Sequence, residues 1–117
     1  MIVDLSELKK HLRVDGDEED SLIVAYESAA SARVQQWLGR PVYARIEDMP
    51  LAGAPGYDDY QVVADGAIRI AVLQYVDRMW NKRSGDGGAS DDATPPRSIR
   101  ELLSGHRVFS DMANANG

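Results

Sequence analysis

A chain of 117 residues with 44% apolar side chains is typical of one folded domain, and its lack of cysteine excludes disulfides and thiolate chemistry. The formal net charge is −6, and the acidic excess lies in residues 1–60, which hold 6 basic and 12 acidic side chains. Because proteins that grip duplex DNA need a basic surface, this balance disfavours a DNA-binding role. The apolar runs are short and interrupted by charge, and no signal-peptide pattern opens the chain. We therefore expect a cytoplasmic protein without a membrane span.

A short helix is predicted close to the start of the chain. Asp4 and Glu7 have the spacing of a capping box, in which the N-cap carboxylate bonds the N3 amide and the N3 carboxylate reaches back. The apolar side of this helix would be formed by Leu5, Leu8 and Leu12.

A long second helix is predicted from about Glu18 to Leu38. Gly39 suits its C-terminal cap, and Pro41 prevents the helix from continuing. Apolar residues recur at steps of three and four, as a single buried stripe requires. This stripe comprises Leu22, Ile23, Tyr26, Ala29, Ala30, Val34, Trp37 and Leu38. Several positions of this helix are alanines, and their short side chains permit close approach of another helix.

Residues 42–64 have a weaker pattern. Residues 42–46 alternate as a short strand does, and residues 61–63 could pair with them, with a turn-rich segment between the two. Two interpretations stay open here: a short β-hairpin or an irregular loop.

The second half of the chain predicts two further helices. The first begins near Asp65, a suitable N-cap residue, and runs to about Arg83. Its apolar stripe comprises Ile68, Val72, Tyr75, Val76, Met79 and Trp80. A short fourth helix is expected to start at the Thr-Pro-Pro sequence of residues 94–96. It would pack through Ile99, Leu102 and Leu103.

These elements predict one domain over residues 1–117 that is mainly α, with about four helices, two of them long. The short β-hairpin, if it forms, lies between the second and third helices. Residues 84–94 are rich in Gly, Asp and Ser and predict a mobile loop, and residues 106–117 form a tail.

No constellation of residues predicts catalysis, a metal site or a bound cofactor. The acidic run at residues 15–20 lacks the glycine and the twelfth-position carboxylate of an EF-hand, so we interpret it as solvated carboxylates at a helix N-terminus. His11 and His106 have no companion at metal-ligand spacing. No serine lies in a nucleophile elbow, and residues 85–88 lack the lysine and preceding strand of a phosphate loop. We therefore expect no enzyme activity.

Five residues are candidates for contacts with another protein. Arg40, Arg83 and Arg107 each follow an apolar or helix-ending segment. A guanidinium at such a place can bind backbone carbonyls of its own chain or a partner's carboxylate. Of these two roles, capping within the chain is favoured. Phe109 and Met112 are apolar side chains of the tail, which we expect to become ordered on docking.

Four segments, taken in order, resemble a known protein family. They are Leu-x-x-Leu-Lys-x-His-Leu-Arg-Val-Asp at residues 5–15, Trp-Leu-Gly-Arg-Pro at 37–41, the helix at 68–83, and Pro-x-x-Ile-Arg-x-Leu-Leu-Ser followed by Arg at 96–107. Together they span essentially the whole chain. In these segments the chain is similar to the head–tail connectors of tailed phages, also called head-completion, adaptor or DNA-packaging proteins.

This resemblance implies a structural virion protein, mainly helical, from a phage or prophage. In the family, subunits form a ring at the head–tail junction that is commonly twelve-fold, joins the capsid portal to a stopper or tail-completion protein, and lines the DNA exit channel. The resemblance implies no catalytic residues, and DNA would pass without specific binding. The protein would be made in the cytoplasm of the host bacterium.

Two hypotheses follow for how such a subunit works. The second and third predicted helices would supply both the core and part of the contact between subunits. The alternative is a small DNA-binding or packaging-accessory domain, because residues 5–38 have the layout of a helix–turn–helix, although the acidic bias of those residues argues against it.

Overall fold

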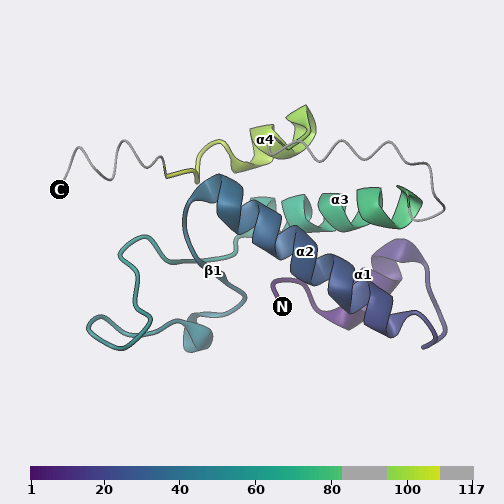
Figure 1. The fold of residues 1–117 in the computed structure, drawn as a ribbon, viewed down its shortest axis with the longest axis horizontal. Coiled ribbons are helices and arrows are strands. Elements are labelled where there is room, and N and C mark those ends of the chain that lie inside the picture. Colours follow the sequence, from purple (N-terminus) through teal and green to yellow (C-terminus); the bar gives the residue numbers. More distant parts are fainter. Residues whose placement is uncertain (83–94, 109–117) are drawn as a thin grey trace.

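Four helices and one small sheet make up the part of the chain that the structure describes. The computed structural model describes residues 1–82 and 95–108 (Figure 1). The elements are α1 (Leu5–Leu12), α2 (Asp20–Leu38), β1 (Val42–Tyr43), a 3-10 turn (Ile46–Asp48), β2 (Val62–Val63), α3 (Gly66–Lys82) and α4 (Arg97–Leu103). The prediction of a mainly α fold with two long helices is confirmed. The predicted mobile loop at residues 84–94 lies outside the described residues.

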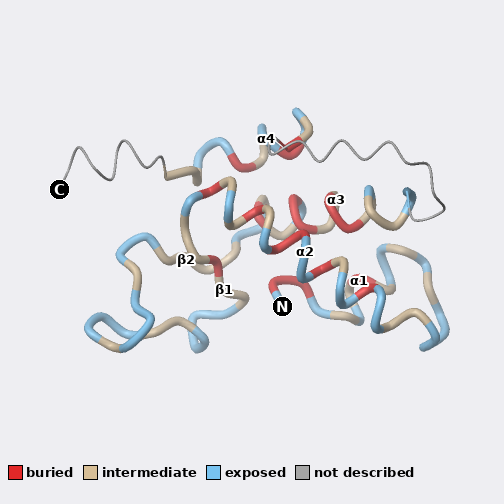
Figure 2. The backbone as a smooth tube through the Cα atoms, viewed as in Figure 1, coloured by how far each residue is buried: buried red, intermediate tan, exposed pale blue. Residues whose placement is uncertain are grey.

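Helices α2 and α3 pack against each other at the centre of the fold. Helix α4 packs on α3, and α1 contacts both α2 and α3 (Figure 1). Buried residues lie along the inner sides of all four helices (Figure 2). The largest fully buried apolar side chains are Leu8, Ile23, Leu38, Ile68, Ile99 and Leu103. One continuous core therefore joins both halves of the chain.

The predicted apolar stripes agree with this core, with two exceptions on α2. The confirmed buried positions are Ile23, Ala30, Val34 and Leu38 on α2 and Ile68, Val72, Tyr75 and Val76 on α3. Tyr26, Trp37, Met79, Trp80 and Leu102 are partly buried against the same core. Leu22 and Ala29, in contrast, face solvent. The stripe on α2 is therefore narrower than predicted.

The helix ends test the predicted caps. The backbone N–H of Ile68 donates a hydrogen bond to Asp65 Oδ1 at 2.9 Å, which confirms Asp65 as the cap of α3. The predicted capping box of α1 is wrong. Asp4 precedes α1 but its side chain makes no capping hydrogen bond, and the Glu7 carboxylate binds the guanidinium of Arg69. An ion pair with another helix has replaced the local contact. Helix α4 begins at Arg97, directly after residues 94–96, where its start was predicted.

The two strands pair in parallel, so the β-hairpin interpretation is wrong. Val62 N–H donates to the carbonyl of Pro41 at 3.0 Å, and Ala64 N–H donates to the carbonyl of Tyr43 at 2.8 Å. Parallel strands cannot be joined by a tight turn and need a long crossover connection. Residues 44–61, hereafter loop 44–61, provide it.

Candidate protein-interaction site

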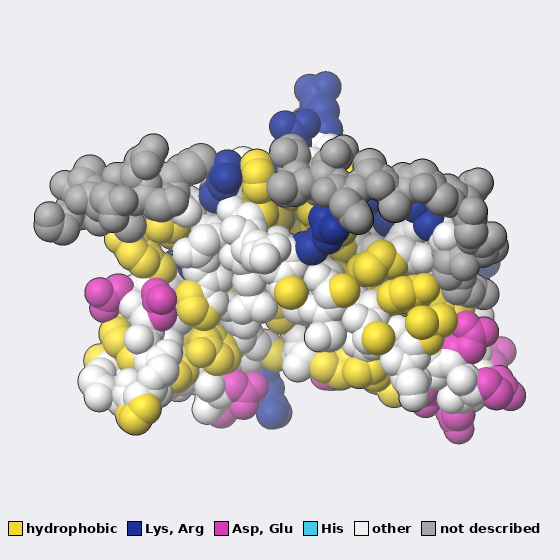
Figure 3. Space-filling view, viewed as in Figure 1, with side chains coloured by type: hydrophobic (Ala, Val, Ile, Leu, Met, Phe, Trp, Pro, Cys, Tyr) yellow, Lys and Arg dark blue, Asp and Glu magenta, His cyan; other side chains and the backbone are white. Residues whose placement is uncertain are grey.

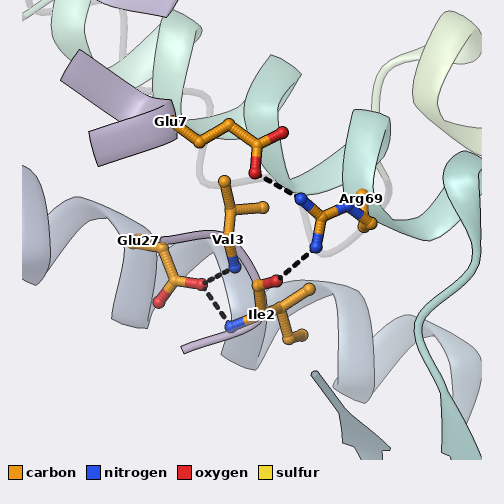
Figure 4. Close-up of polar contacts among 5 residues, drawn as sticks. All are labelled: Ile2, Val3, Glu7, Glu27 and Arg69. Atoms are coloured by element: carbon orange, nitrogen blue, oxygen red, sulfur yellow. Dashed lines mark hydrogen bonds and ion pairs between the residues drawn. The ribbon is translucent and has the colours of Figure 1, made fainter. Parts of the chain in front are cut away.

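A buried glutamate on α2 holds the N-terminal segment against that helix (Figure 4). Glu27 Oε2 accepts hydrogen bonds from the backbone N–H groups of Ile2 at 2.8 Å and Val3 at 3.1 Å. It also accepts one from the Ser31 hydroxyl at 2.8 Å. Glu27 is only 1% exposed. Because buried polar groups must be hydrogen-bonded, these three donors fix the segment to α2.

Helix α3 holds the same segment from its other side. Arg69 Nη1 donates to the carbonyl of Ile2 at 3.1 Å, and Nη2 pairs with the carboxylate of Glu7 on α1 (Figure 4). The side chains of Ile2 and Val3 are buried in the core. The N-terminal segment therefore joins α1, α2 and α3 at one point, which places Met1 beside α2.

The solvent-exposed positions of α2 carry no charged side chain. They are Ser21, Leu22, Val24, Ala25, Ser28, Ala29, Ala32 and Gln36, hereafter the α2 face. Each of the other three helices exposes charge, through Lys10 on α1, Arg78 on α3 and Arg100 on α4. The exposed side of a surface helix normally carries charged and polar side chains, so an uncharged exposed side is suited to packing against a neighbour. Among the described residues, no element covers the α2 face.

An open groove with a volume of about 590 Å³ lies between the α2 face and the base of loop 44–61. Its walls include Met1, Val24, Ser28, Ala32, Tyr43 and Ala44. Most of these side chains are small or apolar, and the buried oxygen of Glu27 on its floor is already bonded to three donors. The groove is therefore suited to contact with a protein surface.

Loop 44–61 is ordered and exposes large apolar side chains. Leu51 is 81% exposed and Ile46 is 68% exposed, and Tyr57 and Tyr60 are also exposed. Consecutive turns fold the loop, with Ala54 N–H donating to the carbonyl of Leu51 at 2.8 Å. Large exposed apolar side chains on a fixed loop are a common feature of protein–protein contact sites.

The base of the loop is fastened by side chains. Gln61 Nε2 donates to the carbonyl of Pro50 at 2.8 Å, and Arg40 Nε donates to the carbonyl of Tyr60 at 2.6 Å. These bonds within the chain fix the conformation of the loop. A preformed loop has a lower entropy cost of binding than a flexible one.

Acidic and basic side chains gather on different parts of the surface (Figure 3). Acidic side chains lie over the α1–α2 connection and over loop 44–61, whereas Lys and Arg lie mainly over α3 and α4. Burial raises the pKa of the Tyr75 phenol, and the charges of Arg33 and Arg78 oppose that rise. Both arginines therefore lie near Tyr75. Arg33 also lies one turn along α2 from Ala29 and from Gln36, so it borders the α2 face.

The acidic α1–α2 connection is partly neutralised by a lysine. Lys9 Nζ lies 2.9 Å from Asp20 Oδ1 and 3.0 Å from Asp17 Oδ1. Hydrogen bonds to Asp20 and then Asp17 raise the pKa of Lys9. The ion pairs between Lys9 and these two carboxylates therefore stabilise the connection between α1 and α2.

Two of the predicted contact residues bind within the chain. Arg40 Nη1 donates to the carbonyl of His106 at 3.1 Å, in addition to its bond to loop 44–61. Arg107 Nε donates to the carbonyl of Trp37 at 2.9 Å, and its guanidinium carbon lies 3.5 Å from the centroid of the Trp37 ring. Arg107 therefore caps the end of α2, whereas Arg40 ties loop 44–61 to residue 106. Both arginines bind carbonyls of their own chain, the role that the sequence favoured. Arg83, Phe109 and Met112 lie outside the described residues.

Replacing Arg107 with alanine is expected to lower the free energy of unfolding by about 1–2 kcal/mol. The change removes a cation–π contact and a hydrogen bond to a helix-terminal carbonyl. Chemical denaturation measures the loss, and in a Trp80→Phe background the emission of Trp37 should shift in the folded state. Arg100→Ala is the control, because Arg100 is exposed on α4 and should change stability by less than about 0.5 kcal/mol. Equal effects of the two variants would contradict the capping role.

The described residues also bear on other classes of function. They contain no group of three or more metal-ligating side chains that could hold an ion. No described helix has the length and apolar content needed to cross a membrane. The surface features described above are those of a protein that contacts other proteins.

Comparison with known proteins agrees with these features. No curated protein and no solved structure matches the chain. The family model of the phage gp6-like head-tail connector proteins matches residues 2–107. This match spans every described helix and both strands. The chain therefore belongs to the phage gp6-like head-tail connector family, whose members have a structural role in the virion.

Proposed function

We propose that this connector forms a closed ring at the head–tail junction of the virion. The ring joins the portal to a stopper or tail-completion protein and lines the channel through which DNA leaves. The observation that supports it best is the α2 face, an uncharged surface along a central helix. When identical copies join through two different surfaces, the contact can repeat around a closed ring. Twelve copies would match the symmetry common in the family.

Light scattering after size exclusion tests the ring. We expect a discrete species of twelve subunits, formed by the chain alone at high concentration or on the portal encoded in the same phage genome. Binding to the portal is measured in parallel by co-elution. A chain that stays monomeric at every concentration and does not bind the portal would contradict the proposal.

The tail is a second part of this proposal. Phe109 and Met112 would dock on the portal or on a neighbouring copy, and Arg83 would contact a partner's carboxylate. Arg40 and Arg107 would act indirectly, by holding residues 106 and 107, which precede the rest of the tail, at the end of α2. Deleting residues 109–117 should therefore weaken co-elution with the portal, and unchanged co-elution would remove the tail from the proposal.

A channel for DNA should let its cargo pass without gripping it. The net charge of −6 supports this, because phosphates are repelled by carboxylates at short range. The same samples should show no retention of duplex DNA at physiological salt. Salt-sensitive retention would favour the alternative, a small DNA-binding or packaging-accessory domain.

A further inference from the structure

We infer that loop 44–61 of one copy binds the α2 face of the next copy, head to tail. This inference rests on the proposed ring and names the two surfaces that would build it. The occupant of the α2 face is thus a second copy of this chain. Three observations support this pairing: the distribution of exposed apolar side chains, the placement of the two surfaces and their charges.

The exposed large apolar side chains fall mainly into two groups. One group lies on and beside the α2 face, with Leu22, Val24 and Met1. The other lies on loop 44–61, with Ile46, Leu51, Tyr57 and Tyr60. The α2 face carries mostly short side chains and borders a groove, whereas loop 44–61 protrudes. A protruding apolar loop and a shallow apolar surface can bury each other, which stabilises both by removing apolar area from water.

The protruding part of the loop and the N-terminal part of the α2 face lie toward opposite ends of the molecule. In Figure 1 the loop extends at the left end of the longest axis, whereas the N-terminal half of α2 lies toward the right end. A loop of one copy is therefore placed to reach the α2 face of a neighbour rather than its own. A contact between two different surfaces of identical subunits is heterologous, the kind from which rings are built.

The charges around the two surfaces are complementary. Loop 44–61 carries Glu47, Asp48, Asp58 and Asp59 and a single basic residue, Arg45. Arg45 already faces Glu47 and Asp48 at 3.8 and 3.6 Å. Arg33 lies on α2 one turn from Ala29 and from Gln36, so it borders the α2 face. The acidic loop and this arginine attract each other and orient the approach, whereas two α2 faces would bring two such arginines together.

Cross-linking tests the contact directly, since the chain has no cysteine of its own. A chain that carries both Ala25→Cys and Leu51→Cys is treated with a flexible bis-maleimide under conditions in which the wild-type chain assembles, alone or on the portal. We expect a ladder of covalent multimers. The matched control combines Ala25→Cys with Ser104→Cys, an exposed position that follows α4 and belongs to neither surface, and should give no ladder.

Blocking each surface separately tests the direction of the contact. Ala25→Glu places bulk and negative charge on the α2 face, and Leu51→Asp removes the most exposed apolar side chain of the loop. Each variant alone should fail to form a ring. An equimolar mixture should stop at one-to-one pairs, because each pair has one intact loop and one intact α2 face and uses both. Ser104→Glu should assemble as the wild type does.

The outcomes separate this inference from the proposed ring. If the wild type assembles, no ladder forms and both blocked variants assemble normally, the pairing is wrong and the ring stands. If Ala25→Cys cross-links to the portal instead of a second copy, the α2 face belongs to the portal and the inference is overturned. If the wild type never assembles, with or without the portal, the ring and the pairing both fail. Circular dichroism of each variant confirms that its helices are intact.

Discussion

Replacing Glu27 with alanine is expected to cost about 3 kcal/mol of unfolding free energy. The change leaves the N–H groups of Ile2 and Val3 and the hydroxyl of Ser31 without their acceptor. Each buried donor that loses its partner costs about 1–3 kcal/mol, and relief from burying a carboxyl group offsets part of the sum. The N-terminal segment should then detach from α2 while the rest of the core stays folded.

Urea denaturation measures the loss, and amide hydrogen exchange at Ile2 and Val3 locates it. Glu27→Gln keeps a side-chain oxygen and should cost less than Glu27→Ala. Glu18→Ala, a change at an exposed glutamate, is the matched control and should stay within about 0.5 kcal/mol of the wild type. If Glu27→Ala lowers the free energy of unfolding as little as Glu18→Ala does, the N-terminal segment is not held by Glu27.

Replacing Gly39 with alanine is expected to cost about 2–4 kcal/mol. Gly39 has a φ of +71°, which strains any residue with a Cβ, and the added methyl group would overlap the backbone carbonyl of Val108. Val108 N–H donates to the carbonyl of Leu38 at 2.6 Å, so residues 106–108 would have to move away from α2. The bonds made by Arg107 and Arg40 at the same place would then be lost.

Two other glycines separate strain from overlap. Gly53 has a φ of +86° but nothing within 4 Å of an added Cβ, so Gly53→Ala measures the backbone strain alone. Gly105→Ala has neither problem and should be nearly neutral. Thermal or urea denaturation compares the three variants, and in a Trp80→Phe background the emission of Trp37 reports release of residues 106–108 from α2. A Gly39→Ala variant as stable as Gly53→Ala would show that residue 108 does not pack closely on α2.

The helices were predictable because their signals are local. Caps such as Asp65 and Gly39, and apolar steps of three and four, depend on residues within one or two turns. Glu27 was not predictable in the same way. Its partners are backbone N–H groups 24 and 25 residues away, and every residue except proline offers such a group. A sequence pattern shows which side chain needs a partner but not which distant backbone supplies one.

Of the candidate site, the sequence predicted features that depend on neighbouring residues but not those that depend on distant ones. The alanines of α2 indicated a helix that another helix can approach closely. The structure shows that the exposed side of α2 is also free of charge. Loop 44–61 was not recognised as an ordered protrusion, since its order depends on the parallel pairing of β1 with β2 and on Arg40. Pairing direction cannot be read from strands of two residues each. For Arg40 and Arg107 the sequence favoured contacts within the chain over contacts with a partner, but only the structure shows which carbonyls they bind.

The parallel direction of β1 and β2 also limits how short this protein can become. A hairpin can be trimmed to a two-residue turn, but two parallel strands must be bridged by a dozen residues or more. Loop 44–61 is therefore required by the sheet itself, whatever it contacts. Deletions that approach a tight turn should unpair the strands, whereas insertions at the tip around Gly53 should be tolerated. Natural and engineered relatives can thus lengthen this protrusion freely but shorten it only to about a dozen residues.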